Sequence, residues 1–361
     1  MLRLGALLVV SLATACGSAG SEASQAPGSD AGVDSHASLP DASTDATAAA
    51  DGDDAKTACS YAAAPELVLG EEATGRGVSL ATRGGGYIFS TWRGKTYSGD
   101  TSRLYRTSIQ SRESQLIYEA SRALSLIGAN DDRVFLGEGG EYLADVLELD
   151  HAGAVQVSHD VSAEPRPAFG LRSGQAVYAL EQGKLSKLTA SGWQTVTAAP
   201  GMSFVSQIAS STLIAYDGDR RQLCVLDEAK GAFEPCVSAP TQVGDLNPLY
   251  SVVSAVHQAG AWALLGVTAN GGAISLRAAD TWTPEFVTQH QSTLNDVGLV
   301  NDQAVWLDQQ SIDQNTFETS LSTATSAAWT VPGQAYALLD LCGCGLGLVI
   351  KRQGLYFVAK P

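Results

Sequence analysis

Short alternating runs of apolar and polar residues dominate the chain from residue 65 onward. These runs are rich in Val, Leu, Ile, Tyr and Trp, and Gly, Asn, Asp or Ser interrupt them about every eight to twelve residues. An alternation with a period of two places successive side chains on opposite faces of a strand, and closely spaced turns are typical of antiparallel sheets. The pattern therefore predicts an all-β domain, to which we assign residues 59–361.

One segment, SRESQLIYEASRALSLIG, also fits a short amphipathic helix. Its apolar residues fall near helical spacing at Leu116, Ile117, Ala120, Leu124 and Ile127. We predict two strands here, because the rest of the domain shows little helical periodicity.

A repeat organises these strands. Seven tight turns, each followed by an apolar strand, end at Gly86, Asp132, Gly174, Ser211, Gly260, Asp302 and Gly345, at intervals of 37 to 49 residues. One four-stranded blade of a propeller takes about 40–45 residues. We take the apolar strand as the second strand of each blade. An alternating run follows it in every unit as the third strand, and in six units another run can form the fourth strand.

The last unit runs out of chain before a fourth strand. The apolar run PELVLGEE, residues 65–72, is otherwise unassigned and can supply it. Closing the ring in this way hides sheet edges that would otherwise recruit other chains. The domain thus resembles the β-propeller superfamily, and we predict seven blades, the last completed by the N-terminal strand. Six or eight blades, or paired β-sandwiches, are the alternatives.

The first residues, MLRLGALLVVSLATAC, have an early cation, a short apolar stretch and small residues before Cys16. This arrangement predicts a signal peptide over residues 1–15. Ala13-Thr14-Ala15-Cys16 resembles the lipobox of bacterial lipoproteins, although Leu12 lies one position earlier than the family's apolar residue. The resemblance implies lipidation of Cys16 and, since Gly17 follows, export to the outer membrane. Secretion without lipid is the alternative.

Residues 16–58 are almost wholly small or polar, with eight acidic residues against Lys56. Low hydrophobicity and charge repulsion predict a disordered spacer between the lipidated cysteine and the folded domain. The whole chain has a formal charge of −16, which disfavours nucleic acid as a partner. We expect a monomer whose membrane contact is the lipid on Cys16.

Five further cysteines follow. Cys224 and Cys236 lie on the expected third and fourth strands of one blade, and facing positions of such a hairpin reach bonding distance. We predict a disulfide between them. Cys59, Cys342 and Cys344 are odd in number, so their pairing stays open. A bond from Cys59 would join the ends of the ring, and the alternatives are a Cys342–Cys344 link or metal binding.

Catalytic signatures are absent: the sequence has no His-Glu-x-x-His, Gly-x-Ser-x-Gly, Walker A or dinucleotide-binding glycine pattern. Asp217 and Asp219 favour a hairpin turn over a calcium site. Trp262 and Trp306 are expected in the core, while Trp282 is the best candidate for contact with a ligand.

We therefore expect a non-catalytic recognition or scaffold protein that needs no cofactor or metal and binds a protein or glycan through rim loops. One alternative is a hydrolase or lyase with its site in the central channel. Another is an envelope-assembly component, similar to the propeller lipoprotein that helps insert outer-membrane barrels.

Overall fold

A computed structural model gives the fold. It describes residues 65–70, 77–93, 101–139, 143–161, 171–173, 176–181, 183–205, 213–243, 247–258, 260–269, 271–278, 281–287, 292–300, 303–312, 317–323, 326–340, 346–350 and 353–358. Every regular element among them is a β-strand. These residues include no helix long and apolar enough to cross a membrane.

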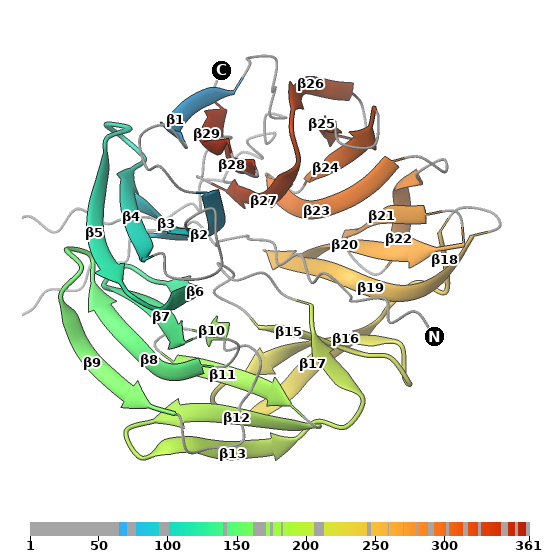
Figure 1. The fold of residues 1–361 in the computed structure, drawn as a ribbon. Coiled ribbons are helices and arrows are strands. Elements are labelled where there is room, and N and C mark those ends of the chain that lie inside the picture. The colour runs from blue at the N-terminus through green and yellow to red at the C-terminus, as the bar shows by residue number, and fades with distance from the viewer. Residues whose placement is uncertain are drawn as a thin grey trace, which may run out of the picture. The chain divides into compact units, whose positions relative to one another are not determined.

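The strands form seven antiparallel sheets arranged around a ring (Figure 1). Blade 1 consists of β2 (Gly77–Gly84), β3 (Tyr87–Arg93), β4 (Ser102–Ser108) and β5 (Ser114–Ala120). Blade 2 consists of β6 (Ala123–Ala129), β7 (Arg133–Gly139), β8 (Leu143–Asp150) and β9 (Val155–Asp160). Blade 3 consists of β10 (Leu171–Ser173), β11 (Ala176–Glu181), β12 (Lys184–Thr189) and β13 (Gly192–Ala198).

Blade 4 consists of β14 (Met202–Phe204), β15 (Ile214–Asp217), β16 (Gln222–Asp227) and β17 (Ala232–Ser238). Blade 5 has five strands, β18 (Gln242–Val243), β19 (Asn247–Gln258), β20 (Ala261–Thr268), β21 (Gly271–Ala278) and β22 (Thr281–Val287). Blade 6 consists of β23 (Ser292–Val300), β24 (Gln303–Ser311), β25 (Phe317–Thr323) and β26 (Ser326–Pro332).

Blade 7 joins the two ends of the domain. It contains β27 (Ala335–Asp340), β28 (Leu346–Ile350) and β29 (Gly354–Val358), and its outer strand is β1 (Glu66–Gly70). β1 pairs antiparallel with β29, with Leu67 opposite Tyr356 and Leu69 opposite Leu355. The predicted closure is confirmed, and seven blades replace the alternatives of six, eight or two sandwiches. The segment read as two strands rather than a helix forms β5 and β6.

The core lies between neighbouring blades. Blades pack against both faces of their neighbours' inner strands, so that β15 and β28 are buried along their whole length. Trp262 and Trp306 are both almost fully buried, as predicted. Burying such large apolar side chains contributes about 1.5–3 kcal/mol each.

Candidate functional site

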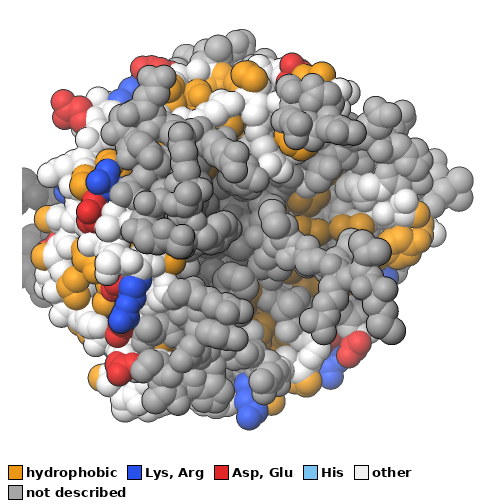
Figure 2. Space-filling model, in the orientation of Figure 1, with side chains coloured by type: hydrophobic (Ala, Val, Ile, Leu, Met, Phe, Trp, Pro, Cys, Tyr) orange, Lys and Arg blue, Asp and Glu red, His pale blue; other side chains and the backbone are white. Residues whose placement is uncertain are grey.

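Polar depressions gather at one end of the sheets. In blades 1 to 4, the turn between strands one and two and the turn between strands three and four lie at the same end, which we call the turn end. Depressions at the turn end of blades 1 to 4 are lined by described residues. Figure 2 shows acidic and basic side chains side by side along the edge that carries β5, β8 and β9.

Blades 1 and 2 approach each other closely here. A Cβ atom on Gly84 would lie 2.5 Å from the carbonyl oxygen of Asn130, so only glycine permits this approach. The Asn130 side chain closes the β6–β7 turn, since its Oδ1 accepts from the backbone N–H of Asp132 at 2.9 Å and of Arg133 at 2.7 Å. The two turns therefore bring β3 and β4 of blade 1 beside the β8–β9 turn of blade 2.

Arg106 on β4 spans this junction. Its Nη1 donates to the carbonyl oxygen of His151 at 2.8 Å, and its Nη2 donates to Oε1 of Gln115 at 2.8 Å. The guanidinium carbon lies 4.8 Å from the centroid of the Tyr87 ring, within the range of a cation–π contact. The His151 ring meets the Tyr87 ring edge-on at 5.8 Å. These contacts hold the guanidinium in one orientation.

The His151 imidazole bonds to the neighbouring β6–β7 turn. Its Nε2 lies 3.0 Å from the carbonyl oxygen of Asn130, and because a carbonyl can only accept, Nε2 carries the hydrogen. Burial lowers the pKa of His151, while the hydrogen bond to Asn130 opposes that shift. The neighbouring Asp150 closes the β8–β9 turn, and the backbone N–H of Ala154 is the largest cause that lowers its pKa.

A depression of about 570 Å³ opens beside Arg106. Tyr87 and Arg106 form one wall, and the β4–β5 turn forms the other with its polar side chains: Ser108, Ser111, Glu113, Ser114 and Gln115. Backbone hydrogen bonds fix that turn, with Ser108 N–H donating to Glu113 O at 2.9 Å and Arg112 N–H donating to Ser108 O at 3.0 Å. The arrangement offers one cation, one carboxylate and several hydroxyl groups to a polar ligand.

A second depression, of about 190 Å³, lies where blades 2, 3 and 4 meet. Glu148, Lys187 and Glu228 supply its charged groups. Glu148 Oε1 accepts from His159 Nε2 at 3.0 Å, and the Tyr178 hydroxyl donates to Glu228 at 3.3 Å. Burial, followed by the negative charge of Glu228, raises the pKa of Tyr178 to about 12. The tyrosine therefore stays protonated as a donor.

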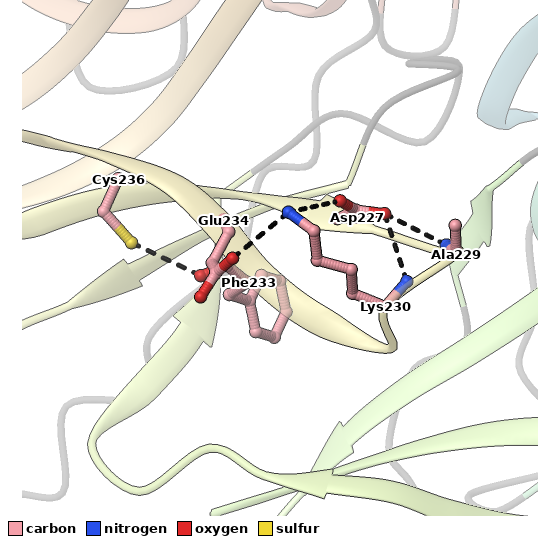
Figure 3. Close-up of polar contacts among 6 residues, drawn as sticks. All are labelled: Asp227, Ala229, Lys230, Phe233, Glu234 and Cys236. Atoms are coloured by element: carbon pink, nitrogen blue, oxygen red, sulfur yellow. Dashed lines mark hydrogen bonds and ion pairs between the residues drawn. The ribbon is translucent and has the colours of Figure 1, made fainter.

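The hairpin of β16 and β17 carries the predicted disulfide. Cys224 and Cys236 are opposite each other in register, with Cα atoms 4.1 Å apart, and their sulfur atoms are bonded. Figure 3 shows the turn of this hairpin, where Lys230 reaches Asp227 at 3.1 Å and Glu234 at 3.3 Å. The Sγ atom of Cys236 lies 3.4 Å from the Phe233 carbonyl as a packing contact, because a disulfide sulfur has no hydrogen to donate.

Other predicted site residues are dispersed. Trp282 packs against the cluster between blades 4 and 5, and its Nε1 donates to the carbonyl oxygen of Ser238 at 2.7 Å. Asp217 forms the expected turn, its Oδ1 accepting from Asp219 N–H at 3.0 Å. Among the described residues, no three His, Cys, Asp or Glu side chains gather into a group that could hold a metal ion. Cys16, Cys59, Cys342 and Cys344 lie outside the described residues.

Sequence reasoning did not select Tyr87, Arg106 or Gln115. Tyr87 belongs to an apolar strand, and Arg106 is one of many polar residues in an alternating strand. The one signal in the sequence that could have indicated a binding site was the position of Arg106, a cation on an expected third strand near a predicted turn.

Comparisons with known proteins support the fold. No family model matches the sequence, and no curated protein matches it. Among solved structures, YCF48 bound to D1 peptide is similar with a TM-score of 0.51 and 12% identity, covering 79% of this chain and 92% of that chain. One of two prolyl endopeptidases studied for inter-domain dynamics is similar with a TM-score of 0.50 and 12% identity, covering 82% of this chain.

This chain spans only 51% of that endopeptidase. The β-propeller domain of the Trilobed protease from Pyrococcus furiosus gives a TM-score of 0.45 at 10% identity, covering 69% of this chain and 95% of that domain. At such identities the first two likenesses show a shared β-propeller architecture and nothing finer.

Proposed function

We propose that this protein is an exported, lipid-anchored recognition protein without catalytic activity, which binds a protein or glycan at the turn end of blades 1 to 4. The observation that carries the proposal is the fixed guanidinium of Arg106 beside a depression of about 570 Å³. Polar side chains that are already held in place lose little conformational freedom when a ligand arrives, and so favour binding. Peptide binding by YCF48 is compatible with a ligand on this architecture.

The anchor in this proposal is Cys16, and residues 16–58 act as the spacer in front of the propeller domain of residues 59–361. A flexible chain of this length has a root-mean-square reach of roughly 35 Å. That reach would hold a recognition domain clear of the lipid headgroups. An acylated cysteine with two or three chains exceeds the marginal membrane binding of one chain. We place the protein at the outer membrane.

A labelling experiment tests the anchor. Cells that express the full chain are grown with radioactive palmitate, and the purified protein is examined for label beside a Cys16→Ser variant. We expect label on the wild type and none on the variant. Label retained by the variant, or an unlabelled wild type, would contradict lipidation at this cysteine.

A capture experiment tests recognition. The full chain is purified in detergent, immobilised, and exposed to envelope extracts and to a glycan panel. A Glu148→Gln/Lys187→Gln variant and the Arg106→Gln variant alter the two depressions, and Arg122→Gln alters an exposed residue paired with Asp145. We expect at least one turn-end variant to lose a captured ligand and Arg122→Gln to keep it. Capture of nothing, or equal capture by all four proteins, would count against the proposal.

A further inference from the structure

The charge of Arg106 has no carboxylate partner among the described residues. Its two hydrogen-bond acceptors, the carbonyl of His151 and the amide oxygen of Gln115, are both neutral. Glu113 lines the same depression, yet the hydrogen bond to its carboxylate comes from Ser111 and not from the arginine. The depression therefore presents a separate cation and anion in a domain whose chain is strongly acidic.

The held guanidinium suits a carboxylate. Arginine has five N–H donors in a planar fork, of which Arg106 uses two in the described contacts. The Tyr87 ring beside the guanidinium and the bonds to His151 and Gln115 restrict the orientation of the fork. A planar fork pairs with a carboxylate through two parallel hydrogen bonds, which a lysine cannot reproduce.

The rest of the lining suits hydroxyl groups. Ser108, Ser111 and Ser114 can each donate and accept, and the Glu113 carboxylate accepts only. The described lining contains no aliphatic side chain that would seat an apolar residue of a peptide. A volume of about 570 Å³ lies within the range of roughly 300–1,000 Å³ usual for small-ligand pockets.

We propose that this depression binds a sugar residue bearing a carboxylate, a hexuronate unit of an acidic polysaccharide. The carboxylate pairs with Arg106, and the ring hydroxyls bond to the serines and to Glu113. This inference rests on the proposed function and names its ligand class. The negative charge of the chain opposes polyanions in general, so binding depends on the contact between Arg106 and a correctly placed carboxylate.

Titration calorimetry on the detergent-purified full chain tests the inference with three probes: trigalacturonate, neutral galactotriose, and a short peptide with a free C-terminal carboxylate. We expect trigalacturonate to bind and the other two to bind at least tenfold more weakly. Arg106→Gln should lower the affinity for trigalacturonate by about ten- to hundredfold, the usual value of a charge-assisted hydrogen bond.

One further variant controls for net charge, and another tests the site independently of Arg106. Arg122→Gln makes the same charge change at an arginine that is 58% exposed and pairs with Asp145, and it should bind as the wild type does. Glu113→Gln changes an exposed turn position and should lose several-fold in affinity even if Arg106→Gln unfolds.

Three results would overturn the inference: equal binding of the neutral sugar, tighter binding of the peptide, or full affinity in a folded Arg106→Gln protein. In each of these cases recognition itself can still stand, because the capture experiment judges it separately. If capture of a ligand depends on Glu148 and Lys187 but not on Arg106, the inference about Arg106 is likewise overturned, and the proposed recognition function stands.

Discussion

Arg106 on blade 1 donates a hydrogen bond of 2.8 Å to the carbonyl oxygen of His151 on blade 2. The two residues are 45 positions apart, roughly one blade repeat, so the contact forms only when neighbouring blades pack. The binding groups at the turn end are therefore positioned by the interface between blades. Damage to that interface should reach the proposed site even when no lining residue is changed.

Closure of the ring should depend on Gly354, which lies on β29 opposite Gly70 of β1. Gly354 has a φ of +148°, and a Cβ atom there would lie 2.2 Å from the carbonyl oxygen of Leu69 on β1. We expect Gly354→Ala to push β1 away and to lower the free energy of unfolding by about 2 kcal/mol or more. Urea unfolding followed by tryptophan fluorescence measures the change.

Gly86→Ala is the matched control, since a Cβ atom at Gly86 meets nothing within 4 Å. Its unfolding midpoint should stay close to that of the wild type, within about 0.5 kcal/mol. Equal stability of the two alanine variants would show that closure does not depend on the narrow approach at Gly354.

Removal of the Cys224–Cys236 disulfide should destabilise blade 4. The bonded residues are 12 positions apart, and the chain-entropy model gives about 3 kcal/mol for a loop of this size. Cys236→Ala and the double variant Cys224→Ala/Cys236→Ala should lose similar amounts, because either change breaks the bond. Thermal unfolding measures both. A single variant as stable as the wild type would mean that the bond contributes nothing.

His151 should make stability depend on pH. Burial lowers its pKa in the folded protein below the ordinary value of 6.5, so just below that value the unfolded chain binds more protons. The wild type should therefore lose stability relative to His151→Gln as pH falls from 8 toward 5. Arg106 lowers the pKa further, whereas Asp131 and Asp132 raise it.

Urea midpoints measured at several pH values test this expectation. Glutamine keeps an N–H donor for the Asn130 carbonyl but does not titrate, so the difference between the two proteins isolates the imidazole. Parallel pH curves, or a difference that grows in favour of the wild type on acidification, would be inconsistent with a histidine whose pKa is lowered in the folded protein.

Much of the fold could be predicted because its signals are local. The period-two alternation locates strands such as β3 and β24, and the turn spacing counts the blades. The closing strand β1 follows from the lack of a fourth strand after β29. The Cys224–Cys236 bond could be predicted because the two residues belong to one hairpin, 12 positions apart.

The candidate site could not be predicted in this way. Arg106 depends on Tyr87, Gln115 and His151, which lie on three elements of two blades. The bond from Trp282 to the carbonyl of Ser238, 44 positions away, shows the same limit, because it too joins residues of neighbouring blades. Local alternation indicates which face of a strand is polar, and not which polar side chains of neighbouring blades meet.

The pairing of β1 with β29 also sets an order of events during biogenesis. Residues 66–70 leave the ribosome before the strands of blades 1 to 6, and their partners at 354–358 leave it after those strands. Each growing chain therefore carries β1 without its partner strand until β29 emerges. An unpaired strand edge can pair wrongly during this interval.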